Sequence, residues 1–75
     1  LALDHSRDKI KVAGEAVGQA DENLRTIRER FRQGVALNAD VLDAEVFLLQ
    51  AKTARTQAAI DLVLAQARLE KALGN

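Results

Sequence analysis

The sequence contains no cysteine, proline, tryptophan or tyrosine, and its only aromatic residues are two phenylalanines. Without cysteine the chain cannot form disulfides or thiolate metal sites. Its single histidine, His5, cannot form a zinc site alone or activate a cysteine nucleophile. We therefore expect no catalytic residue, no metal site and no cofactor. The stability of so short a chain has to come from helix packing and self-association.

The sequence also has no excess of charge of one sign and no long apolar run. Eleven basic and eleven acidic side chains are interspersed, and the formal net charge is zero. A nucleic-acid surface would show a clustered basic excess, so we expect no nucleic-acid partner. No apolar run approaches the ~20 residues of a membrane-spanning helix, and the start has no signal-peptide pattern. Because the 75 residues begin in mid-helix, we expect a segment of a larger protein whose targeting and membrane parts lie elsewhere.

Helix-forming residues in a heptad pattern make up the first half of the chain. Apolar or small residues recur at alternating spacings of three and four, which is the a/d seam of a coiled coil. This seam comprises Leu3, Ser6, Ile10, Ala13, Val17, Ala20, Leu24, Ile27 and Phe31. Gly14 and Gly18 lie beside the seam, where we expect them to permit close packing. On the polar side we expect Arg25 to form i,i+4 ion pairs with Asp21 and Glu29.

One break interrupts the helical pattern. Gly34 follows the last seam residue and a basic final turn, which is typical of a helix that ends in a left-handed residue. Asn38 or Asp40 can cap the next helix through a side-chain oxygen. A connection this short makes the helices antiparallel, so we predict an all-α fold, a long antiparallel two-helix coiled-coil hairpin. Its predicted parts, within a single domain over residues 1–75, are a helix at about 3–33, a turn at about 34–39 and a helix at about 40–73.

The second helix carries two adjacent apolar stripes, although a two-helix hairpin needs only one stripe on each helix. The first stripe comprises Val41, Ala44, Leu48, Ala51, Ala58, Leu62, Ala65, Leu69 and Ala72, with Arg55 as an interruption. The second stripe comprises Leu42, Val46, Leu49, Thr53, Thr56, Ile60, Val63 and Ala67. A second stripe predicts a further neighbour, as in a bundle or a closed wall of helices. The remaining polar face comprises Asp40, Asp43, Phe47, Gln50, Ala54, Gln57, Asp61, Leu64, Arg68 and Lys71.

Two features near the turn have more than one interpretation. Val35, Ala36 and Leu37 are apolar at the hairpin tip, which indicates either contact with another protein or a local contact that seals the helix end. Several arginines crowd the last turns of the first helix, where cations favour the negative end of the helix dipole. The alternative is a basic collar for an acidic partner, and we favour the dipole interpretation. These arginines are Arg25, Arg28, Arg30 and Arg32.

Four segments, in this order and spacing, carry a resemblance to a known family. They are Ala-Asp-Glu-Asn-Leu-Arg at 20–25, Arg-Phe-Arg-Gln-Gly at 30–34, Asp-Val-Leu-Asp-Ala-Glu at 40–45 and Ala-Arg-Leu-Glu-Lys-Ala-Leu-Gly at 67–74. With these segments the chain resembles the outer-membrane efflux factor family of TolC-type channels over nearly its whole length. In that family the corresponding segment is the C-terminal-half hairpin of the periplasmic tunnel.

The resemblance implies a trimeric channel in the envelope of Gram-negative bacteria. Hairpins from all protomers would pack into a closed α-helical barrel, with this segment in the periplasm and its parent protein in the outer membrane. Any contact with the membrane would be made by parts of the parent protein outside this segment. The resemblance also implies that the tip docks the periplasmic adaptor (membrane fusion) protein. The tip residues are Gly34, Val35, Ala36, Leu37 and Asn38.

The same resemblance implies a pore aperture at Asp40 and Asp43. An i,i+3 pair shares one helix face, and three-fold repetition would surround a narrow opening with carboxylates. Such a ring attracts cations and repels anions. The simpler interpretation is that both aspartates favour the positive end of the helix dipole, and the two interpretations are compatible.

Other functions fit the sequence less well. The coiled-coil hairpin of a periplasmic adaptor protein carries an Arg-Leu motif at its tip, whereas the chain has Arg68-Leu69 far from the turn. A generic helical oligomerisation module explains the heptads but not the apolar tip. We do not expect an enzyme, because a hairpin cannot build a water-excluding pocket around Asp40 and Asp43. As an isolated chain we expect self-association, with two hairpins paired in a four-helix bundle.

Overall fold

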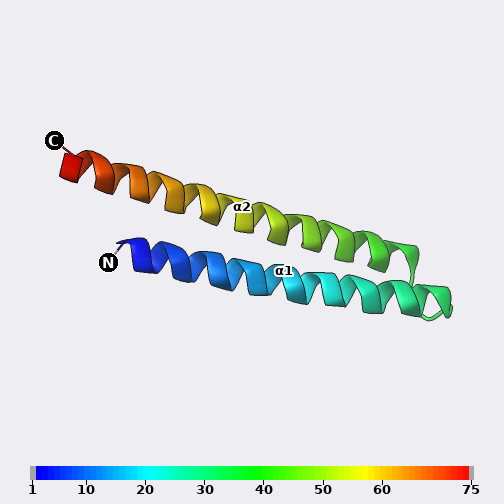
Figure 1. Cartoon of the computed structure of the whole chain (residues 1–75). Coiled ribbons are helices and arrows are strands. Elements are labelled where there is room, and N and C mark those ends of the chain that lie inside the picture. Colours follow the sequence, from blue (N-terminus) through cyan, green and yellow to red (C-terminus); the bar gives the residue numbers. More distant parts are fainter. Residues whose placement is uncertain (1, 75) are drawn as a thin grey trace.

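The computed structural model describes residues 2–74, with side chains from residue 5 onward, and consists of two long helices joined by a tight turn (Figure 1). Helix α1 spans Ala2–Arg32 and helix α2 spans Asn38–Gly74. The helices run antiparallel, so the start of α1 and the end of α2 lie at the same end of the molecule, far from the turn (Figure 1). The molecule measures 63 × 15 × 11 Å. The predicted all-α fold, a long antiparallel two-helix hairpin, is confirmed.

The predicted seam of α1 packs against the first stripe of α2. Ala20 is only 1% exposed, and alanine at such positions lets two helices approach closely. The buried cluster comprises Val17, Ala20, Leu24, Val41, Ala44 and Leu48, with Ile27 and Ala51 packed against it. Each fully buried valine or leucine contributes roughly 1.5–3 kcal/mol. A core this small gives a modest free energy of unfolding.

The core is concentrated in the half of the hairpin next to the turn. Beyond Leu48, Ala58 is the one further buried residue of α2 within the part of the chain that the structure describes. The two ribbons also draw apart toward the ends of the chain (Figure 1). The prediction that the seam of α1 and the first stripe of α2 are buried was therefore wrong at their margins, because Phe31 of the seam is 45% exposed and Leu69 of the first stripe is exposed as well. Leu3, also assigned to the seam, lies outside the residues whose side chains are described.

The second stripe of α2 lies on the surface of the isolated hairpin. Its large side chains are all at least about half exposed, as expected for a stripe that α1 does not cover. They are Leu42, Val46, Leu49, Ile60 and Val63. One helix therefore presents apolar side chains on two sides, of which the hairpin itself uses one.

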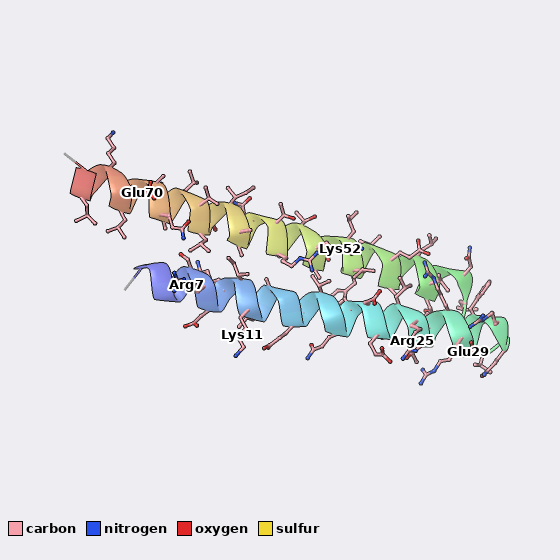
Figure 2. The ribbon with its side chains drawn as sticks, in the orientation of Figure 1. Arg7, Lys11, Arg25, Glu29, Lys52 and Glu70 are labelled. Carbon is pink, nitrogen blue, oxygen red and sulfur yellow. The ribbon has the colours of Figure 1, made fainter. Side chains whose placement is uncertain are left out.

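The charged side chains lie along the outer sides of the helices, as Lys11 and Arg25 do on α1 (Figure 2). Arg25 donates to Glu22, three residues away, and not to Asp21 or Glu29. Glu29 instead pairs with Arg32. The predicted i,i+4 pairs were wrong because i,i+3 partners are equally close on a helix surface, and the side-chain rotamers decide between them.

Gly14 and Gly18 do not mediate close packing within the hairpin. A Cβ atom built at either residue would meet nothing within 4 Å. The expectation of close packing was therefore wrong for the contact between α1 and α2, since both glycines face open space.

Gly34 differs, because its φ of +79° lies in the left-handed region. We expect Gly34→Ala to lower the free energy of unfolding, because a Cβ atom in that conformation costs roughly 1–2 kcal/mol. Gly18→Ala is the matched control, since alanine in a helix is favoured over glycine by roughly 0.5–1 kcal/mol. Urea unfolding followed by circular dichroism measures both variants. The same direction of change in both would contradict the assigned role of Gly34.

Candidate functional site

The turn begins with a backbone motif that ends α1. The amide of Val35 donates to the carbonyl of Arg30 at 2.9 Å, and the amide of Gly34 donates to the carbonyl of Phe31 at 3.0 Å. These two bonds, with Gly34 in the left-handed conformation, form a Schellman motif. The end of α1 is therefore closed by backbone hydrogen bonds, as the glycine after a basic last turn predicted.

The apolar residues of the tip remain largely on the surface. Val35 and Leu37 are each 71% exposed, whereas Ala36 is half-buried. In a Schellman motif the sealing hydrophobic contact joins the second residue after the cap to the third residue before it. Here these residues are Val35 and Arg30, so the sealing contact could involve only the aliphatic stem of an arginine. Most of the apolar surface of the tip is left uncovered.

Helix α2 starts at Asn38, earlier than the sequence indicated. The carbonyl of Leu37 accepts from the amides of Asp40 and Val41 at 3.0 and 3.3 Å. Leu37 is thus the N-cap residue and Asn38 already belongs to the helix, so Asn38 is not the capping residue. The capping side chain is that of Asp40, whose Oδ2 accepts from the amide of Leu37 at 2.9 Å. This is the returning half of a capping box, which Leu37 cannot complete because its side chain has no oxygen.

Asp43 lies about one turn beyond Asp40 on the same side of α2. Both aspartates line a shallow groove between the helices, together with Asn23, Ile27, Ala44 and Phe47. The carboxylate of Asp43 is exposed, and it has no hydrogen-bond or ion-pair partner among the described residues. The two aspartates therefore share a face but differ in their bonding.

Three arginines of α1 line a different groove, on the other flank of the hairpin. Arg25, Arg28 and Arg32 follow one another at helical spacing on that flank, beside the half-exposed Phe31. The groove is completed by Asp21, Leu24 and Val41. Near the turn, Arg25, Arg28 and Arg32 therefore lie on one flank of the hairpin, here called the basic flank, and Asp40 and Asp43 lie on the other.

The basic flank is compensated within the chain. Arg25 pairs with Glu22, and Arg32 pairs with Glu29. The hydrogen bond from Arg25 to Glu22, and the charge of that carboxylate, raise the pKa of the Arg25 guanidinium above its ordinary value. Because these arginines already pair with carboxylates of the same helix, the dipole interpretation is favoured over a basic collar that binds an acidic partner.

One link between the helices was not predicted from the sequence. Arg28 of α1 and Glu45 of α2 form an ion pair at 3.5 Å. Counted along the sequence, Arg28 and Glu45 are almost equally far from Ala36, which lies in the middle of the turn. Residues placed in this way face each other across an antiparallel hairpin. That register was the signal that could have revealed the pair.

The described residues contain no cluster of histidine, aspartate or glutamate that could hold a metal ion. In the same part of the chain, neither helix has an apolar stretch of the length and hydropathy needed to cross a membrane.

Comparison with known proteins identifies a family for this chain. The family model described as outer membrane efflux protein matches residues 1–75. No curated protein and no solved structure matches the chain significantly. Because the family match covers the whole of the helical hairpin, its turn and both of its flanks, the chain belongs to the outer membrane efflux protein family.

Proposed function

We propose that this hairpin is the periplasmic tip of a trimeric outer-membrane efflux channel, where it forms part of the tunnel wall and aperture and docks the adaptor protein of a tripartite multidrug pump. The family match supports an efflux channel component. The observation that carries the finer proposal is the largely uncovered apolar tip, with Val35 and Leu37 each 71% exposed. The hairpin acts by packing and docking, and it performs no chemical step.

The second stripe supports a place in the tunnel wall. Helix α2 already packs on α1 through its first stripe, so a neighbour on another side is needed to cover Leu42, Val46 and Leu49. A closed wall of helices supplies such a neighbour for every hairpin. In the isolated chain a second copy of the hairpin takes that place.

The tip supports docking of the adaptor. A surface that faces only water is usually polar. Here three consecutive apolar residues, Val35, Ala36 and Leu37, lie at the turn end of a molecule that is 63 Å long. Backbone hydrogen bonds at Gly34 and Leu37 hold this loop in one conformation, so little conformational entropy is lost on docking. The docking residues are Gly34, Val35, Ala36, Leu37 and Asn38.

The shared face of Asp40 and Asp43 supports the aperture. Repetition of the pair around a three-fold axis places a ring of carboxylates at a narrow opening, and such rings select for cations. The groove that both residues line lies on the flank opposite to the arginines. A cation at the opening therefore meets the carboxylates and not Arg25, Arg28 or Arg32.

Leu37→Asp in the full-length channel tests the docking proposal. We expect adaptor binding to weaken by roughly tenfold or more, because a charge replaces an apolar anchor at the interface. Leu73→Asp is the matched control, since Leu73 is 77% exposed but lies at the other end of the hairpin. Affinity is measured with purified channel and adaptor. Unchanged binding by the Leu37 variant, or equal loss in both variants, would refute docking through this tip.

A further inference from the structure

The second stripe of α2 has nearly the same order of residue types when it is read from either end. Its centre is Thr53 and Thr56, and outward from each threonine follow two large apolar residues at the same spacings. A contact between identical chains about a two-fold axis needs such a pattern, because residue i then meets residue j of the other copy and j meets i. These apolar residues, all exposed in the hairpin, are Leu49 and Val46 on one side and Ile60 and Val63 on the other.

The two central threonines can be covered without the loss of a hydrogen bond. The hydroxyl of Thr53 donates to the carbonyl of Leu49 at 2.9 Å, and the hydroxyl of Thr56 donates to the carbonyl of Lys52 at 3.1 Å. A hydroxyl that is buried without a hydrogen bond opposes a contact, but these two are already bonded within α2. The polar centre of the stripe is therefore compatible with a second helix packed upon it.

The charges on the polar face of α2, which borders the stripe, differ between its two ends. Asp40 and Asp43 lie near the start of the helix, whereas Arg68 and Lys71 lie near its end. In an antiparallel pair the acidic start of one α2 lies beside the basic end of the other, and the two helix dipoles are opposed. A parallel pair would bring like charges together. The charges therefore favour an antiparallel contact.

We infer that two copies of the hairpin pair through the second stripe of α2, antiparallel, about a two-fold axis that passes between Thr53 and Thr56. Val46 of one copy then faces Val63 of the other, and Leu49 faces Ile60. The inference names the occupant of the stripe in the isolated chain. It does not depend on the proposed channel, in which a neighbouring hairpin of the wall covers the same stripe.

The register follows from what a shift of one heptad would do. A shift in one direction would place Lys52 of the two copies opposite each other and would set Leu49 against Thr53. A shift in the other direction would set Val46 against Glu70. Like charges and mismatched side chains beside the contact select against such registers in coiled coils. The unshifted register places large apolar residues against large apolar residues on both sides of the axis.

Disulfide cross-linking tests the orientation, since the sequence contains no cysteine of its own. Val46→Cys and Val63→Cys are prepared as separate chains and oxidised at ~100 μM, each alone and as an equimolar mixture. A disulfide cannot join residues whose Cα atoms are more than about 7 Å apart, so we expect roughly tenfold more cross-linked dimer in the mixture than with either variant alone. Equal cross-linking by either variant alone would overturn the antiparallel orientation.

Val46→Cys mixed with Thr56→Cys is the matched control for the register. These two positions face each other only after a shift of one heptad, and in the inferred pair they are offset by about 10 Å along the helix axis. We expect little cross-linked dimer from this mixture. As much dimer as from Val46→Cys with Val63→Cys would overturn the register.

Leu49→Cys mixed with Ile60→Cys repeats the measurement at the second facing pair, so that one poorly folded variant does not decide the result. Circular dichroism and sedimentation velocity under reducing conditions identify the variants that fold and pair. Absence of cross-linked dimer from both facing mixtures would overturn pairing through this stripe. Adaptor binding by the Leu37→Asp channel would still decide the proposed function.

Discussion

Replacement of Leu48 by aspartate is expected to lower the free energy of unfolding of the hairpin far more than the same replacement at the adjacent Leu49. Leu48 is 9% exposed in the core cluster, and Leu49 is 64% exposed on the second stripe. Loss of a buried leucine side chain costs ~2–5 kcal/mol, and burial of an unpaired carboxylate adds to that cost. A core of this size cannot offset such a loss.

Circular dichroism at increasing urea concentration measures this difference. The two variants carry the same residue at neighbouring positions of one helix, so the lower helix propensity of aspartate affects both alike. Measured at a chain concentration too low for the hairpins to pair, the difference between them therefore reports burial within the hairpin. If Leu49→Asp lost its helical signal to the same extent as Leu48→Asp, the assignment of the first stripe to the hairpin core would be wrong.

The second large effect concerns self-association, which we expect Leu49→Asp to abolish. The unmodified chain should sediment as a pair of hairpins at ~100 μM, because pairing in a four-helix bundle covers the second stripe. A carboxylate in the middle of that stripe would have to be buried without a partner, which costs more than the apolar contact contributes.

Sedimentation velocity compares this variant with Gln50→Asp, which adds the same charge on the polar face of α2. We expect Gln50→Asp to remain associated and Leu49→Asp to be monomeric. A monomeric unmodified chain would remove the second stripe as a contact surface in the isolated segment. Loss of association in both variants would point to general charge repulsion and not to the stripe.

The fold was predictable because its two determinants are local in sequence. Alternating spacings of three and four from Ile10 to Ile27 define one apolar side of α1, and Gly34 after a basic turn marks its end. The helix boundaries were less predictable, since the start of α2 at Asn38 depends on which backbone carbonyl becomes the first acceptor. That choice is made by the conformation of Leu37, for which the residue type gives no signal.

The details of the candidate site depended on side-chain geometry. Asp40 was expected to accept from a backbone amide, but that it reaches back to Leu37 follows from its rotamer. The choice of Glu22 as the partner of Arg25 has the same origin. The second stripe indicated that α2 needs a further neighbour, and its exposure in the hairpin agrees. The neighbour itself belongs to an assembly of several chains, which the pattern of one helix does not specify.

The concentration of buried residues beside the turn has a consequence for the order of folding. Leu24 and Val41 are core residues separated by a short stretch of chain, so bringing them together costs less loop-closure entropy than any contact nearer the termini. We expect contacts between the helices to form first beside the turn and then progressively toward the chain termini. Folding should be rapid, because these contacts are local in sequence. The tip would thus be structured before the far halves of the helices have met their neighbours.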